Sequence, residues 1–162
     1  MATTYEPIAT LTFNGTTSTG TFSSIPATFT DLRLVWTGIT ATAGQNVPVR
    51  LNGDTGTNYS RTAIRGNGSS ATSYRNTSID RFFWVSADTT IPVLGIMDIF
   101  NYSGSTFKTV LTEEATDLNG SGTIIRQCGL WRDTSAITSI TVYGFSGYNL
   151  TGTATLYGIL KA

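Results

Sequence analysis

Hydrophobic residues in this chain come in short runs that often alternate with polar positions, and clusters of Gly, Asn, Ser and Thr separate the runs. Alternation with a period of two places one set of side chains on one face of a strand. In residues 47–51, for example, Val47, Val49 and Leu51 share one face, and Asn52-Gly53 follows as a strong turn signal. The pattern predicts strands at 31–36, 47–51, 59–65, 82–85, 93–100, 107–116, 123–131, 137–145 and 153–161.

Helices are not predicted, because no segment sustains apolar residues at i, i+3, i+4 and i+7. Residues 108–115 come nearest, but their Thr and Val content favours a strand. The runs 82–85 and 93–100 are apolar throughout and are predicted to be buried on both sides. The sequence therefore predicts an all-β chain, a jelly-roll-like antiparallel β-sandwich of about 8–10 strands.

We expect residues 1–162 to form a single domain, a length at which one chain can bury a substantial core. Residues 1–7 are a candidate extended N-terminal arm. The stretch Gly66 to Asp80 is long, polar and without a pattern, so it predicts an exposed loop of the kind that carries binding.

The charges argue against a nucleic-acid partner, and the length of the apolar runs argues against a membrane span. Only 12% of residues are charged, the formal net charge is zero and no basic stripe occurs, so we expect no direct contact with nucleic acid. No apolar run approaches the length of about 18 residues that would span a membrane, and the first residues do not resemble a signal peptide.

The single cysteine, Cys128, cannot form an internal disulfide, and its apolar neighbours predict a small buried side chain.

Candidate catalytic chemistry is sparse. The chain contains no histidine, which excludes Ser-His-Asp and Cys-His catalysis and metal sites with histidine ligands, and one cysteine cannot form a zinc site of cysteines alone. Glycoside hydrolysis stays open, since it needs only two carboxylates, with Glu113 and Glu114 as candidates and Asp98 or Asp117 as partner. Adjacent strand residues point to opposite faces, so Glu113 and Glu114 are not expected to share a cleft. We expect no enzyme and no cofactor.

A calcium site is the remaining candidate for a bound ion. The segment from Asn52 to Asn58 offers several oxygen ligands on a tight loop. Its only carboxylate is that of Asp54, and it lacks the spacing of an EF-hand, so a plain turn is the favoured interpretation.

The three tryptophans divide into two kinds. Trp36 and Trp84 lie in strongly apolar runs and are predicted to be buried in the core, whereas Trp131 lies between Gly129 and Arg132 and is predicted to be partly exposed. Trp and Arg are enriched at binding hot spots, so this corner is a candidate subunit interface or ligand contact. The candidate interface residues are Tyr5, Arg65, Tyr74, Arg75, Trp131 and Arg132.

Several phrases, taken in order, carry a resemblance to a known group of proteins. They are the segments Tyr5-Glu6-Pro7-Ile8-Ala9, Phe22 to Leu32, Ile99 to Ser105, Gly129-Leu130-Trp131, Ala136 to Ile140 and Thr153 to Ile159. Together they resemble small virion proteins of tailed bacteriophages, many from aquatic phages, over nearly the whole chain. The phrases describe turns and strands and name no active site.

The resemblance implies a non-enzymatic β-sandwich subunit that forms oligomers in a virion. It favours a capsid decoration (cement) protein that binds the major capsid protein and its own copies, as a homotrimer or homodimer, on the capsid surface. The alternative that it leaves open is a receptor- or glycan-binding module of a tail fibre or baseplate.

Overall fold

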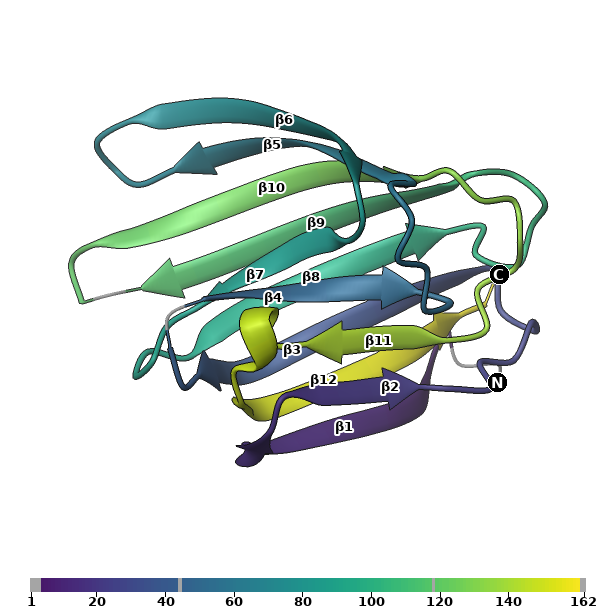
Figure 1. Ribbon diagram of the computed structural model, residues 1–162, viewed down its shortest axis with the longest axis horizontal. Helices are drawn as coiled ribbons and strands as arrows, with labels where there is room; N and C mark the ends of the chain where they lie inside the picture. The colour runs from purple at the N-terminus through teal and green to yellow at the C-terminus, as the bar shows by residue number, and fades with distance from the viewer. Residues whose placement is uncertain (1–3, 44, 118, 161–162) are drawn as a thin grey trace.

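The protein is a two-layer sandwich of antiparallel sheets (Figure 1), and the computed structural model describes residues 4–43, 45–117 and 119–160. The strands are β1 (Tyr5–Thr17), β2 (Thr19–Phe22), β3 (Asp31–Ala41), β4 (Gln45–Leu51), β5 (Tyr59–Gly66), β6 (Ala71–Ile79), β7 (Phe82–Ala87), β8 (Val93–Phe100), β9 (Lys108–Asp117), β10 (Gly122–Trp131), β11 (Ile140–Tyr143) and β12 (Leu150–Ile159). A short 3-10 turn, η1 (Phe145–Gly147), connects β11 to β12. Within the described ranges, no helix has the length and hydrophobicity of a membrane span.

Eight of these strands form a jelly roll. β1 pairs with β12, β2 with β11, β3 with β8 and β4 with β7, so the chain runs as one long antiparallel ribbon that folds across two sheets. One sheet then holds β1-β12-β3-β8 and the other holds β2-β11-β4-β7. The predicted all-β sandwich of jelly-roll type is confirmed.

Two hairpins interrupt the ribbon and enlarge one sheet. β5–β6 is inserted between β4 and β7, and β9–β10 between β8 and β11. β9 pairs with β8 and β10 pairs with β5, so the larger sheet has eight strands in the order β1-β12-β3-β8-β9-β10-β5-β6. In Figure 1 the strands β10, β5 and β6 extend past β7, the last strand of the four-stranded sheet.

The core lies between the two sheets and follows the predicted alternation. Val47, Val49 and Leu51 are fully buried on one face of β4, and Trp36 is fully buried on β3, as predicted. The predicted turn at Asn52-Gly53 is also confirmed, because both residues have a positive φ and Asp54 N donates to Leu51 O over 2.9 Å. The side chain of Trp84 lies outside the residues that the structure describes.

Two polar side chains, one buried and one half-buried, hold the connecting segments at one end of the sandwich by hydrogen bonds. The ammonium of Lys108, which is fully buried, donates to the carbonyls of Gly104, Thr106 and Thr134 over 2.7, 2.5 and 3.3 Å. Asn52 Oδ1 accepts from the N–H groups of residues 138 and 139 over 2.8 and 3.1 Å. These contacts satisfy carbonyl and N–H groups that would otherwise be costly to bury.

Two predictions about segments were wrong. Residues 5–7 are no free arm but the start of β1, where Tyr5 pairs with Ile159; residues 1–3 lie outside the described part. The predicted loop from Gly66 to Asp80 is mostly strand β6, joined to β5 by a turn at residues 67–70. β6 is an edge strand with solvent on both faces, so its sequence carries no alternation.

Candidate interaction surface

The predicted interface corner at Trp131 is a packed structural contact. Trp131 is only 1% exposed, its ring stacks on Tyr59 with centroids 6.3 Å apart, and its Nε1 donates to Asp54 Oδ2 over 2.7 Å. Arg132 donates to the carbonyl of Thr57 over 2.8 Å. The prediction of a partly exposed Trp131 was wrong because β10 turns this residue toward the inside of the sheet, on the same face as Gln127 and Gly129.

The Asp54 carboxylate is occupied by the protein itself. Its Oδ2 also accepts from Asn58 Nδ2 over 2.9 Å, and its Oδ1 accepts from Gly56 N over 2.7 Å. Burial opposes ionisation of Asp54, but the hydrogen bonds from Trp131, Asn58 and Gly56 outweigh it and lower the pKa of the carboxyl below its usual value. The segment from Asn52 to Asn58 is therefore a hydrogen-bonded turn, and the described residues hold no group of three or more metal-binding side chains.

The candidate glycosidase carboxylates are separated as the strand pattern predicts. Glu114 is 2% exposed on the inner face of β9, whereas Glu113 is exposed on the outer face. Asp98 and Glu113 do line one shallow pocket of about 140 Å³ on the outer face. Arg33 donates to both oxygens of Asp98 over 2.6 and 2.8 Å, so this carboxylate is held in an ion pair. An acid and a base placed across a cleft are not recognisable in this arrangement.

The other sequence-predicted interface residues do not form one site. Tyr5 and Arg75 lie on the solvent side of the eight-stranded sheet, at opposite edges, where Tyr5 packs near Arg33 and Arg75 donates to Thr62 over 3.2 Å. Arg65 and Tyr74 lie on the opposite face of the same sheet, since they pair with Ile125 and Ala63, which are buried. The structure therefore places these four residues on two faces.

Exposed hydrophobic residues are concentrated on one surface that the sequence analysis missed. The large hydrophobic side chains that are exposed in the described part of the chain are Tyr5, Ile64, Leu94, Phe100, Phe107, Leu111 and Ile124. All lie on the solvent side of the eight-stranded sheet, except that Phe107 directly precedes β9. We call this surface, at β5, β8, β9 and β10, the apolar outer face.

Strand register arranges the apolar outer face in rows. Leu94 of β8 lies opposite Ala115 of β9, which lies opposite Ile124 of β10. Two residues along each strand comes the row Ile96, Glu113, Arg126 and Ile64, and after it the row Asp98, Leu111, Cys128 and Thr62. Cross-strand neighbours on one face have Cβ atoms about 4.5–5.5 Å apart, so the apolar side chains form a continuous block with charges set inside it.

Cys128 belongs to this surface. It is exposed, which makes the predicted burial wrong, because Ile125, Gln127 and Gly129 take the inner positions of β10. Together with Ile64, Leu111 and Arg126 it lines a pocket of about 290 Å³. This size is at the lower limit for small-molecule sites, so the hollow suits a side chain that protrudes from a partner protein.

The prediction that residues 93–100 are buried on both sides was wrong for one face. Val93, Met97 and Ile99 are buried, but Leu94 and Phe100 are 49% and 39% exposed. An apolar strand face that nothing covers has the same sequence pattern as a covered one. The apolar run at residues 93–100 was therefore the sequence feature that indicated this surface, but it could not show whether the outer face of the strand is covered or exposed.

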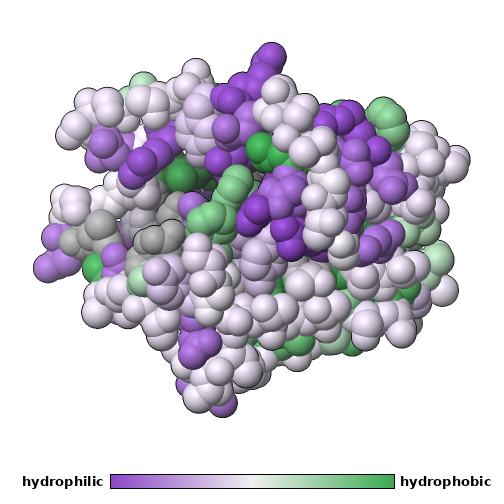
Figure 2. Space-filling model, viewed as in Figure 1, coloured by the Kyte–Doolittle hydropathy of each residue, from purple (hydrophilic) through white to green (hydrophobic). Residues whose placement is uncertain are grey.

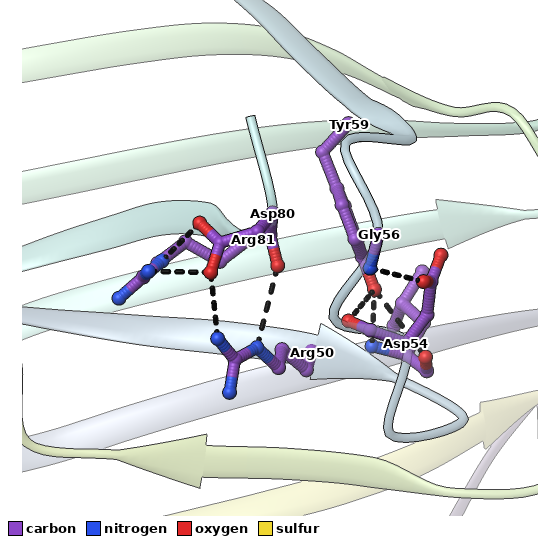
Figure 3. Close-up of polar contacts among 7 residues, drawn as sticks. Arg50, Asp54, Gly56, Tyr59, Asp80 and Arg81 are labelled. Atoms are coloured by element: carbon purple, nitrogen blue, oxygen red, sulfur yellow. Dashed lines mark hydrogen bonds and ion pairs between the residues drawn. The ribbon is translucent and has the colours of Figure 1, made fainter. Parts of the chain in front are cut away.

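The opposite side of the sandwich, seen in Figure 2, carries mostly residues of intermediate hydropathy with hydrophilic patches and a few hydrophobic residues between them. Arg50 of β4 and Arg81, which directly precedes β7, both donate to Asp80 (Figure 3), and the bond from Arg50 Nη2 measures 2.7 Å. The hydrogen bond from Arg81 is the largest cause that lowers the pKa of Asp80. The Arg81 guanidinium also lies 5.7 Å from the ring centre of Phe83 and 5.2 Å from that of Phe145. We call these five residues, Arg50, Asp80, Arg81, Phe83 and Phe145, the arginine–aromatic cluster.

Comparisons with known proteins gave no match: no family model, no curated protein and no solved structure is significantly similar to this chain.

Proposed function

We propose that this protein is a non-enzymatic structural subunit of a bacteriophage virion, a capsid decoration (cement) protein that binds the major capsid protein on the outside of the shell. The observation that carries the proposal is the apolar outer face. A large exposed apolar surface marks a place where another protein binds, because leaving it in water is costly. The resemblance of the turn and strand phrases to phage virion proteins supplies the kind of particle.

The shape of the surface supports association rather than catalysis. The apolar outer face lies on a regular sheet, and its hollows, of about 140 and 290 Å³ beside Leu111 and about 540 Å³ beside Ile124, are open to solvent. Strand backbones hold its side chains in fixed rows, so little conformational entropy is lost when a partner covers them. A weak contact of this kind, repeated over a shell, adds up to a large stabilisation of the particle.

The rest of the molecule supports the same role. The jelly roll has one continuous core, and its connecting segments are fixed by the buried Lys108 and the half-buried Asn52. A rigid body resists deformation when a shell expands under internal pressure, since a packed interior has low compressibility.

Binding to bare capsids tests the proposal. Purified protein is mixed with capsids that lack it, and co-sedimentation is measured as protein is added. We expect saturation at a fixed ratio to the major capsid protein and a higher temperature of capsid disruption. If the protein binds no capsid and leaves the disruption temperature unchanged, the proposal fails.

A second function, a glycan-binding module of a tail fibre or baseplate, is supported by the arginine–aromatic cluster. Aromatic rings beside guanidinium groups suit the apolar and polar sides of a sugar, and Phe83 and Phe145 lie 6.1 Å apart between ring centres. Binding of the protein to host surface glycans on an array, lost in Phe145→Ala, would favour this function over the capsid role. No signal on the array or on host cells would end it.

A further inference from the structure

We infer that two copies of this chain pack through the apolar outer face, about a two-fold axis that passes between Arg126 and Glu113. The inference goes beyond the proposed function and concerns the same surface: a second copy and the major capsid protein cannot cover the apolar outer face of one chain at the same time, so the dimer is a state of the protein that is not bound to a shell. A second copy is the partner to which the charges on this face are matched.

The size of the surface is sufficient for a stable dimer. The sheet has eight strands. The axis lies between β9 and β10, so three strands on each side of it can overlap those of a second copy. With strands about 4.8 Å apart that each present roughly seven residues at about 3.4 Å, these six strands measure about 690 Å². A standard interface buries about 600–1,000 Å² on each partner. Stacked sheets pack about 10 Å apart, a distance that side chains such as Ile64, Leu111 and Ile124 fill.

Two opposite charges lie side by side within the apolar block. Glu113 of β9 is directly opposite Arg126 of β10, and both side chains are exposed. Within the described part of the chain, neither side chain forms an ion pair or a hydrogen bond. Each is therefore available to a group that approaches from outside the sheet.

In a dimer with two-fold symmetry, Glu113 and Arg126 can form two equivalent contacts between the copies. In a symmetric dimer the same patch meets itself, and if residue i contacts residue j, then j contacts i. An axis between Arg126 and Glu113 sets each arginine against the glutamate of the partner copy, which gives two equivalent ion pairs. The neighbouring Arg33 and Asp98 already neutralise each other, so the centre of the face has no net charge. A partner of one charge sign would gain nothing from this arrangement, whereas a second copy would.

Charge reversal tests the dimer. The molar mass of the purified protein is measured over a concentration series by sedimentation velocity, for the wild type, Glu113→Arg, Arg126→Glu and the double variant. We expect a wild-type dimer, a weakening of about tenfold or more in the dissociation constant of each single variant, and recovery in the double variant. Recovery is specific to a self-complementary contact.

Arg65→Glu is the matched control, because Arg65 lies on β5 beside the same strands but on the opposite face. It should dimerise like the wild type. At concentrations where the wild type is monomeric, all variants should keep its melting temperature, since the exchanged side chains are exposed in one chain. A wild type that stays monomeric throughout the series, or single variants that dimerise unchanged, would overturn the inference.

Cys128 provides a second readout that needs no mutation. A dimer through this face covers the thiol, so its reaction with a thiol reagent should slow as the protein concentration rises, and Glu113→Arg should abolish that slowing. An unchanged rate at concentrations where a dimer is present would place the contact elsewhere. If the protein is monomeric but Leu111→Asp abolishes capsid binding, the face binds the capsid instead, which also overturns the dimer. A dimer that binds no capsid would contradict only the proposed function.

Discussion

The indole of Trp131 and the carboxylate of Asp54 are joined by a hydrogen bond of 2.7 Å that fixes the loop after β4 to the end of β10. These residues are 77 positions apart in the sequence. The loop leaves the four-stranded sheet and leads to β5 in the larger sheet, so this bond joins the two layers at one corner. The corner at Trp131, which the sequence predicted to be an interface, is therefore an internal contact that holds two parts of the fold together.

Trp131→Phe is expected to destabilise the protein. The substitution keeps an aromatic ring against Tyr59 but leaves Asp54 Oδ2 without its indole donor, at a cost of about 1–3 kcal/mol in the free energy of unfolding. Urea denaturation measures this loss. Arg132→Ala, which removes a neighbouring and more exposed contact, should cost less than about 1 kcal/mol. Equal losses in the two variants would contradict the role of the Trp131–Asp54 bond.

Lys108→Met is expected to be more damaging than its conservative size suggests. Methionine fills the space but cannot donate to the carbonyls of Gly104, Thr106 and Thr134, which stay buried. Hydrogen bonds to a charged group contribute about 1.5–3 kcal/mol each, but the burial of the ammonium offsets part of this gain, so we expect a loss of about 2–4 kcal/mol in total. Denaturant unfolding measures it, with Arg65→Gln as control, because Arg65 is exposed and lies outside the apolar outer face. A variant as stable as the wild type would show that these carbonyls find other donors.

Gly158→Ala should destabilise the protein through crowding. A Cβ at Gly158 would overlap the ring of Phe29, whereas a Cβ at Gly66 would meet its nearest atom, Ile124 Cγ2, at 3.6 Å. Overpacking of this kind costs about 1–3 kcal/mol. Thermal unfolding should therefore show a lower melting temperature for Gly158→Ala than for Gly66→Ala, and the reverse order would contradict the packing described for β12.

Stability should be flat near neutral pH and should fall in acid. Hydrogen bonds from Arg81 and Arg50 lower the pKa of Asp80, and the Trp131, Asn58 and Gly56 donors lower that of Asp54, both from a usual value of 3.8. A carboxyl with a lower pKa in the folded state stabilises fully above its unfolded pKa, and this contribution is lost as the pH falls through the folded value. The chain has no histidine, whose ordinary pKa lies in the range from about 5 to 8. Urea midpoints measured from neutral to acidic pH would contradict this if they changed mainly near pH 6–7.

The sequence predicted the strands whose two faces differ. Val47, Val49 and Leu51 alternate with polar residues because only one side of β4 faces the core. β6 could not be found in this way, since both of its faces are in water and nothing selects for alternation. The first residues were missed for another reason: β1 packs on the core through Leu11 and Phe13, but a bulge between Pro7 and Ala9 breaks the alternation near its start.

The apolar outer face was not predicted, because its strands are apolar on a side that is exposed. Leu94 and Phe100 lie in an apolar run that predicts burial on both sides, and only the topology reveals that no second layer of the described residues covers the outside of β8. Cys128 was placed inside by its apolar neighbours, but its face is set by the pleat of β10. Which side of a sheet is covered depends on residues far away in the sequence, so local pattern could not supply it.

Electron cryomicroscopy of virions that contain this protein tests the central claim most directly. The account predicts regular density for a jelly roll with one enlarged sheet, repeated over the outside of the capsid at two-fold or three-fold positions and in contact with the major capsid protein. Density for this fold only at tail fibres or the baseplate, with a bare capsid surface, would contradict the account and favour the glycan-binding function of the arginine–aromatic cluster.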